Sequence, residues 1–224
     1  MISIDINEDG FDPIFLDIKE RYLSSLNFPK LIIGTGLSIA MGVPGMSGLA
    51  HKLEKEFQII DDEYLTQKWA EYSEKIKTDG LEAALLDVST NEEVFIEKIR
   101  EITSEFILDK EYEQHSTILN EISGLEKMLK YLSGTVSVNN QILDIMTPNY
   151  DRIIEIICDK LKLSTTLGFA GNIYQRFDEN ILKKPYDFYS KDVAVVRIFK
   201  PHGSVNWIKV DGKEYQINDY NLLK

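Results

Sequence analysis

Three short polar segments of this 224-residue chain carry side chains that could do chemistry together. They are Gly34-Thr35-Gly36-Leu37-Ser38, Thr147-Pro148-Asn149-Tyr150-Asp151 and Lys200-Pro201-His202-Gly203-Ser204. Each segment follows a short apolar run that is typical of a buried strand. Because the carboxyl ends of parallel strands share one rim of a sheet, where crevice-bound ligands lie, we expect the segments to meet at one ligand.

The first segment has the composition of a phosphate-binding turn. Gly34 and Gly36 would let the backbone approach a pyrophosphate, and Ser38 adds a hydroxyl near the start of the next helix. The dinucleotide fingerprint would place a third glycine where Ile39 stands, so a purely structural tight turn is the alternative. We include Thr35, from the same turn, in the predicted phosphate-binding set.

The other two segments carry groups that could act on a bound nucleotide. The Asn149 carboxamide could orient a water and a ribose hydroxyl, and Asp151 could support that loop or bond the sugar. Both residue types are also common helix caps, which is the structural alternative. His202 stands between Pro201 and Gly203 at a strand end, and a neutral imidazole there could accept a proton, unless the residue is a capping histidine.

The elements that must position these segments can be placed along the chain. Apolar runs predict strands at 31–33, 141–146 and 193–199, helical periodicity predicts helices at 12–26 and 152–163, and a turn signal predicts a hairpin over 205–217. Charged helices are predicted near 49–60, 62–77, 91–108 and 116–132, with the last two separated at Lys110-Glu111.

This order predicts an α/β protein, a Rossmann-like three-layer fold with a parallel sheet and a helical insertion. Residues 1–50 and 136–224 would form the nucleotide-binding domain, which we expect to be incomplete at its C-terminus, and residues 51–135 the insertion. We expect the charged faces of the insertion to be solvated, with a partner-docking surface as the alternative.

Composition excludes several classes of function. A net charge of -12 disfavours direct nucleic-acid binding, which relies on clustered Lys and Arg. The single cysteine, Cys158, excludes an internal disulfide and a Cys-based zinc module, and its apolar helical context predicts burial. No apolar run approaches the roughly 20 residues that span a bilayer, and the first residues lack a secretory signal, so we expect a cytoplasmic protein without a membrane anchor.

Taken together, the three segments resemble motifs of the sirtuin family. The first, followed by Gly42-Val43-Pro44, is similar to its Gly-Ala-Gly-x-Ser loop and the Gly-Ile/Leu-Pro after it. The second is similar to its Thr-Gln-Asn-x-Asp and the third to its His-Gly. The Asn-Tyr-Asp form and the run from Lys200 to Trp207 resemble especially the bacterial sirtuin-like domains of antiphage defence systems. The resemblance covers roughly residues 30–49, 142–158 and 196–207.

Two departures separate this chain from the protein deacylases of that family. Those enzymes usually carry a four-cysteine zinc module and an Asp-Phe-Arg after the proline, whereas this chain has one cysteine and Gly45-Met46-Ser47. A zinc-dependent deacylase is therefore the least favoured function, and we expect no metal.

The resemblance implies cleavage of NAD to nicotinamide and ADP-ribose, which depletes an infected cell of its cofactor. It assigns Asn149, His202 and Asp151 to catalysis. It assigns NAD binding to Gly34, Thr35, Gly36, Ser38, Pro44, Gly203 and Ser204. It also implies a homo-oligomer and a defence partner such as a DNA-translocating ATPase or an Argonaute. The alternatives are a domain that senses NAD or ADP-ribose without hydrolysing it, and a scaffold whose insertion mediates assembly.

Overall fold

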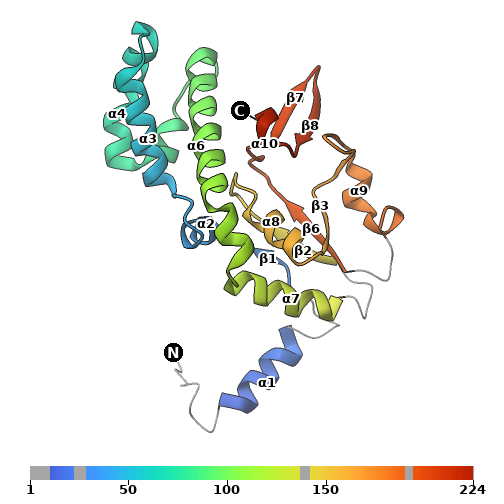
Figure 1. Ribbon diagram of the computed structural model, residues 1–224. Helices are drawn as coiled ribbons and strands as arrows, with labels where there is room; N and C mark the ends of the chain where they lie inside the picture. Colours follow the sequence, from blue (N-terminus) through green and yellow to red (C-terminus); the bar gives the residue numbers. More distant parts are fainter. Residues whose placement is uncertain (1–10, 23–28, 137–141, 190–193, 224) are drawn as a thin grey trace.

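Four parallel strands form the sheet that positions the predicted site. They are β1 (Leu31–Ile32), β2 (Ile142–Met146), β3 (Ser164–Thr166) and β6 (Val195–Phe199), and they lie in the order β1-β2-β6-β3. Figure 1 shows this computed structural model, which describes residues 11–22, 29–136, 142–189 and 194–223. The predicted α/β class with a parallel sheet is confirmed, and the first three predicted strands lie side by side.

The sheet buries one apolar face against two helices. Its buried side chains are Leu143, Ile145, Val196 and Ile198. They pack with α7 (Gly124–Val136) and α8 (Ile153–Lys160), whose inward residues include Leu129 and Ile157. On the other face Arg197 pairs with Asp144 of the neighbouring strand at 2.7 Å, and it donates to the Leu182 carbonyl of α9 (Glu179–Lys183).

A second core lies among the helices that follow the first strand. After α2 (Thr35–Ala40) come α3 (Met46–Ile59), α4 (Glu63–Asp79), α5 (Leu81–Leu85) and α6 (Glu93–Asn120). Phe57, Trp69 and Phe95 form its centre, where the rings of Phe57 and Trp69 stack with centroids 4.7 Å apart. Stacked aromatic pairs of this kind add to the free energy gained by burial.

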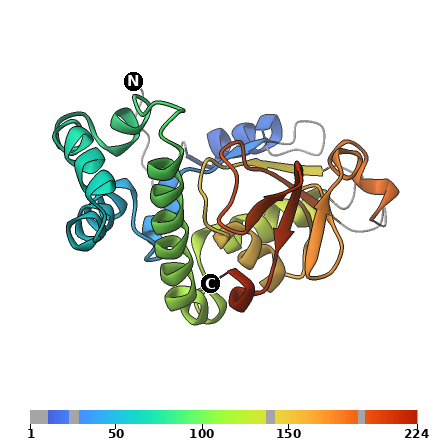
Figure 2. The same ribbon diagram turned by 90° about the horizontal axis from the view of Figure 1, so that it is seen from above.

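Helix α6 joins the two cores. Phe95, Ile99 and Ile102 in its first half belong to the helical core, and Ile118 near its end belongs to the core under the sheet. Figures 1 and 2 show α6 running between the α3–α5 group and the sheet. The range 51–135 predicted as an insertion thus contains helices of both cores.

The predicted break at Lys110-Glu111 is wrong, because α6 continues without interruption from Glu93 to Asn120. Two adjacent charged residues suggested a solvated loop. Glu111 is instead fully buried and paired with Arg152.

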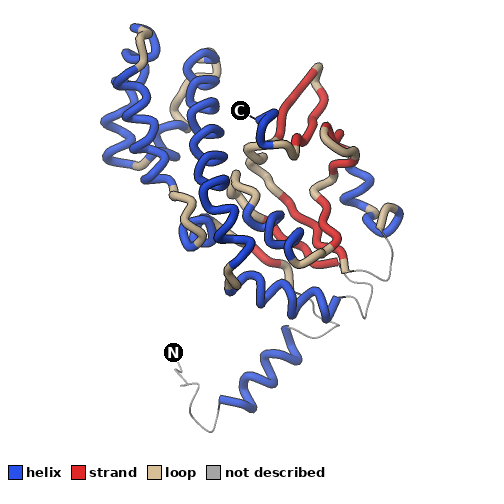
Figure 3. Tube along the Cα trace, in the orientation of Figure 1, coloured by secondary structure: helices blue, strands red, loops and turns tan. Residues whose placement is uncertain are grey.

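A small antiparallel sheet lies beyond the carboxyl ends of the parallel strands (Figure 3). It consists of β4 (Phe169–Ala170), β5 (Tyr174–Phe177), β8 (Lys213–Ile217) and β7 (Trp207–Val210), in that order. The predicted hairpin over 205–217 is confirmed by β7 and β8, whereas β4 and β5 were not predicted. The 3-10 turn η2 (Pro185–Asp187) and the helix α10 (Tyr220–Leu223) complete the described elements.

The first helix, α1 (Phe11–Tyr22), lies at the periphery of the molecule (Figure 1). The helix predicted at 12–26 is confirmed over its described part, and its apolar side chains Ile14, Phe15, Leu16 and Ile18 are between 42 % and 54 % exposed. Its predicted extension to residue 26 falls partly on residues 23–28, which lie outside the described part of the chain. Among the described helices, none combines the length and the apolar character that a membrane crossing requires.

Candidate functional site

The three polar segments lie together at one cavity, as the shared rim of the strands predicted. Its volume is about 180 Å³. The predicted residues that line it are Thr35, Ser38, Pro44, Asn149, Asp151 and His202. They follow β1, β2 and β6, which are consecutive in the sheet, so the parallel register accounts for their convergence.

Hydrogen bonds tie the first segment to the second. The Asn149 Nδ2 atom donates to Ser38 Oγ at 2.8 Å and to the Gly34 carbonyl at 3.1 Å. The Ser38 hydroxyl in turn donates to Asp151 Oδ2 at 2.6 Å. Ser38 is only 2 % exposed, so its hydroxyl orients Asn149 and Asp151 rather than the phosphate we expected it to hold.

The Asn149 carboxamide oxygen, Oδ1, takes part in none of these hydrogen bonds. Asn149 is 7 % exposed, and its Oδ1 atom is buried without a hydrogen-bond partner among the described residues. A buried acceptor in that state is costly unless a ligand or water satisfies it. The bond from Nδ2 to the Gly34 carbonyl, which can only accept, distinguishes the two ends of the amide, so Oδ1 is the acceptor that has no partner among the described residues.

Asp151 has a supporting geometry. Its Oδ1 atom accepts the backbone N–H of Ile153 at 3.2 Å, near the start of α8, while Oδ2 accepts the Ser38 hydroxyl. The N-cap residue of α8 is Arg152, so neither Asn149 nor Asp151 is the cap that sequence reasoning left open, although Asp151 accepts the N–H of the first helical residue. Both carboxylate oxygens are engaged, which suits a residue that holds the loop.

His202 is carried on a tight turn at the end of β6 (Val195–Phe199). Gly203 has φ +83°, a conformation that glycine adopts readily, and its N–H bonds the Lys200 carbonyl at 3.0 Å. The turn leaves His202 exposed, with its ring 6.4 Å from that of Tyr150 between centroids. The imidazole can therefore reach a ligand from the open side of the cavity.

A larger cavity of about 790 Å³ adjoins the first. Gly203, Ser204 and Trp207 line it on one side, and residues of α3, α5 and α6 line it on the other. The two cavities share Met46, Leu49, Glu82, Tyr150 and His202. Trp207, which lines this cavity, has a buried Nε1 atom without a hydrogen-bond partner among the described residues. Its volume falls within the range of about 300–1,000 Å³ that is usual for small-molecule sites.

The two glycines of the first segment have free space next to their backbone. Apart from its chain neighbours and the backbone of its own helix, a Cβ atom added at Gly34 or Gly36 would meet no heavy atom of the described residues within 4 Å, and both glycines are exposed. The fold therefore does not require glycine there for steric reasons. Space next to the backbone is what a close ligand contact would need.

Two buried ion pairs lie beneath the site, and sequence reasoning missed both. Lys200 lies 2.7 Å from Glu155 Oε1, and Arg152 Nη2 lies 2.6 Å from Glu111 Oε1. Burial raises the pKa of the Glu155 carboxyl above its ordinary value, although the neighbouring Lys200 ammonium lowers it. The available signal was a lysine placed directly after a buried strand, which is an unusual position for a charged residue.

The helices also contribute residues that the sequence did not reveal. Glu82 of α5 and Phe106 and Ile107 of α6 line the smaller cavity. Their charged or amphipathic helical context is typical of ordinary surface and core positions, so nothing local distinguishes them.

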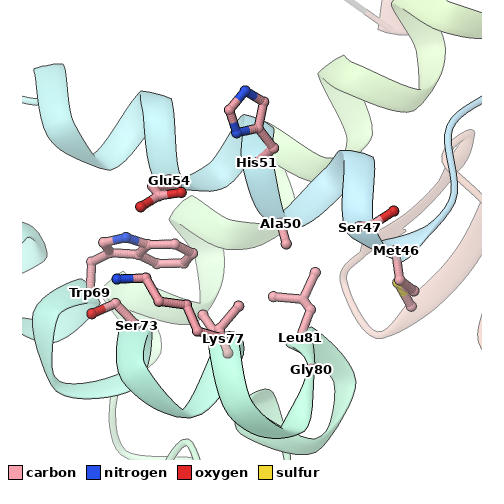
Figure 4. Close-up of a pocket in the computed structure, with 11 residues that line it drawn as sticks. Met46, Ser47, Ala50, His51, Glu54, Trp69, Ser73, Lys77, Gly80 and Leu81 are labelled. Atoms are coloured by element: carbon pink, nitrogen blue, oxygen red, sulfur yellow. The ribbon is translucent and has the colours of Figure 1, made fainter.

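A third cavity, of about 370 Å³, lies within the helical part of the chain. Figure 4 shows Glu54 on one helix next to Trp69 on another, whereas the ring of His51 points away from that second helix. None of the predicted site residues lines it, so we keep it separate from the candidate site.

Comparison with models of protein families found none that matches this chain, and comparison with curated proteins found no match either. The candidate site is therefore argued from its own geometry.

Proposed function

We propose that this chain is an NAD glycohydrolase built on a Rossmann-like nucleotide-binding fold. The observation that carries the proposal is the Asn149 carboxamide: its buried Oδ1 atom has no hydrogen-bond partner among the described residues, and Asn149 lines a cavity together with His202. The resemblance of the three segments to sirtuin-like effectors supports NAD as the substrate and depletion of NAD during phage infection as the role.

The proposed reaction needs little acid catalysis. The bond between the ribose C1′ carbon and the pyridinium nitrogen breaks, and its electron pair neutralises the nitrogen of the departing nicotinamide. A water molecule then forms the new bond to C1′ and loses a proton, which gives ADP-ribose. Positioning the water and accommodating an oxocarbenium-like ribose are the main demands on the protein.

Each residue has a role that its contacts support. Asn149 Oδ1 accepts a hydrogen bond from the water or from a ribose hydroxyl, and Ser38 and Asp151 keep the carboxamide in its orientation. The His202 imidazole accepts the proton that the water loses as it bonds to C1′. The backbone at Gly34 and Gly36 approaches the phosphates in the open space next to it.

The test is the release of nicotinamide from NAD by the parent protein and its variants. Asn149→Ala removes the acceptor, and Asn149→Asp sets a carboxylate oxygen against the Gly34 carbonyl. These two variants and His202→Ala should each remain folded and should each show a kcat that is about 10²-fold or more below that of the parent. His51→Ala, at an exposed histidine outside the site, is the matched control. Undiminished turnover in the folded Asn149 and His202 variants would refute the roles, and no release by the parent would refute the activity.

One observation favours a second candidate, a domain that binds NAD or ADP-ribose without hydrolysis. Both oxygens of Asp151 are engaged by Ser38 and by the Ile153 N–H, so this carboxylate is not positioned to orient the His202 ring as a base. Calorimetry with ADP-ribose beside product analysis separates the candidates. Saturable binding with intact NAD supports the binding domain, and measurable hydrolysis excludes it.

A further inference from the structure

The peptide group between Asp151 and Arg152 is held on both sides by charged side chains. The Lys200 ammonium donates to the Asp151 carbonyl oxygen. Glu111 Oε2 accepts the Arg152 N–H at 2.6 Å. One charge reaches the peptide from the end of β6 (Val195–Phe199) and the other from α6 (Glu93–Asn120), so two distant elements meet at a single backbone unit.

Both charges are buried, and each has its own counter-charge. Glu111 is 0 % exposed, and its Oε1 atom accepts two hydrogen bonds from the Arg152 guanidinium at 2.6 and 2.9 Å. Lys200 is 6 % exposed and pairs with Glu155. Buried ion pairs are a weak source of stability compared with apolar residues of the same size. Their placement on one peptide is therefore better explained by the geometry that they impose.

The same lysine connects the two loops that carry the site. Its ammonium also donates to Ser204 Oγ at 3.1 Å, and the Ser204 hydroxyl donates to the Tyr150 carbonyl at 3.0 Å. The Val205 N–H bonds that carbonyl as well. The loop with Asn149 and the loop with His202 are thus joined through Lys200 and Ser204.

The glutamate connects the loop to the helical part of the chain. Glu111 lies on the helix whose first half belongs to the helical core and whose residues Phe106 and Ile107 line the smaller cavity. Any displacement of α6 would therefore act on the backbone next to Asp151.

We propose that Glu111 and Lys200 are positioning residues, which hold the Asp151–Arg152 peptide from opposite sides and thereby set Asn149 and His202 for the substrate. This inference rests on the proposed function for its catalytic consequence. The structural part of the inference, that both side chains hold the same peptide group, does not depend on the proposed function.

The experiment compares Glu111→Gln, Lys200→Met and the double variant with the parent chain. Lys200→Arg keeps the charge as the conservative variant, and Glu113→Gln, which removes an exposed pair with Lys110 on the same helix, is the control. Steady-state nicotinamide release separates kcat from KM, and calorimetry measures the affinity for ADP-ribose. Hydrogen exchange followed by mass spectrometry reports on the peptides covering 147–153 and 200–207.

We expect kcat to fall about tenfold or more in each single variant with KM within about threefold of the parent, because the groups act on catalytic geometry. The double variant should be little worse than the poorer single one, because both charges act on the same peptide. Exchange should quicken in both loop segments in either variant, Lys200→Arg should recover most of the loss, and Glu113→Gln should match the parent.

Two results would overturn the proposal. One is parental exchange in the loops of folded Glu111→Gln and Lys200→Met. The other is exchange that quickens equally across all elements, which is the signature of a general loss of stability. If Lys200→Met does not fold, Glu111→Gln decides by the same loop exchange. If the parent releases no nicotinamide, the proposed function fails, while loop exchange and ADP-ribose affinity still decide the role of the two residues.

Discussion

Ser38 and Asp151 are 113 residues apart in the sequence, yet the Ser38 hydroxyl donates a 2.6 Å hydrogen bond to Asp151 Oδ2 in the buried floor of the site. The same hydroxyl accepts a bond from Asn149. One small side chain thus links the loop after the first strand to the loop after the second, and it uses both its donor and an acceptor position to do so.

Replacing Ser38 with alanine should weaken both the fold and the site. The Asp151 carboxylate and the Asn149 amide would each lose a buried partner, so the free energy of unfolding should fall by about 1–3 kcal/mol. Nicotinamide release should fall further than this loss of folded protein explains. Urea unfolding and turnover per folded molecule check the two effects. Ser47→Ala, at an exposed serine, is the control, and equal behaviour of the two variants would contradict the linking role.

Alanine at Gly34 or Gly36 should separate ligand binding from stability. In the described part of the chain the added methyl group would contact no residue beyond its own neighbours and helix backbone, and Gly36 lies in a helix, where alanine is favoured by about 1 kcal/mol. Stability should therefore stay equal or rise in Gly36→Ala and should fall modestly in Gly34→Ala, because Gly34 is the N-cap of α2 and glycine is preferred to alanine there. In both variants the methyl group occupies the space proposed for the phosphates. Calorimetry with ADP-ribose should show weaker binding.

The control for this pair is Gly134→Ala in α7 (Gly124–Val136), where a Cβ atom is equally unobstructed but distant from the site loops. Parental affinity for ADP-ribose in Gly34→Ala and Gly36→Ala would show that the phosphates lie elsewhere.

Glu155 should make stability depend on pH in a defined direction. Its pKa in the folded protein is raised above the ordinary 4.5, chiefly by burial. As pH rises past 4.5, the unfolded chain releases this proton before the folded chain does, so the folded state binds more protons and the free energy of unfolding falls. Glu155→Gln, which cannot titrate, lacks this contribution.

The measurement is urea unfolding of parent and Glu155→Gln across the acidic and neutral range. The parent should lose stability relative to the variant as pH rises above 4.5, and the difference should level off once the folded carboxyl is ionised. A difference that stays constant, or that moves in favour of the parent, would contradict the raised pKa.

Cys158 should be unreactive in the folded protein. It is fully buried in α8 (Ile153–Lys160), as its helical context predicted, and burial raises the pKa of its thiol to about 12. The thiolate that reacts with disulfide reagents is therefore scarce near neutral pH. Labelling with such a reagent should remain negligible in buffer and should follow the unfolding transition in urea. Rapid labelling of the native protein would place this helix end nearer to solvent than the structure does.

Much of the fold could be predicted because its signals are local. The runs before Gly34, Thr147 and Lys200 are short and apolar, and glycine or proline follows each of them within two residues. They form neighbouring parallel strands, as expected. The hairpin after Val205 was equally plain, because Asp211 and Gly212 form its turn with positive φ angles.

The predicted helix break at Lys110-Glu111 was wrong because one of its two charged residues is buried. Lys110-Glu111 had the composition of a solvated break, but Glu111 faces inward to a guanidinium 41 residues further along the chain. A helix can bury a charged residue on its inward face when an oppositely charged partner pairs with it there. The periodicity of the helix sequence cannot reveal that partner, because the partner lies far away in the chain.

The amino-acid sequence by itself determined which residues end the strands and that these ends share one rim, because strand and turn preferences depend on near neighbours. Only the tertiary structure decided that the Ser38 hydroxyl bonds Asn149 and Asp151, that Asn149 Oδ1 has no partner within the described ranges and that buried charges hold the peptide after Asp151. These outcomes depend on which distant groups meet after desolvation, where each polar atom must find a partner or be left without one.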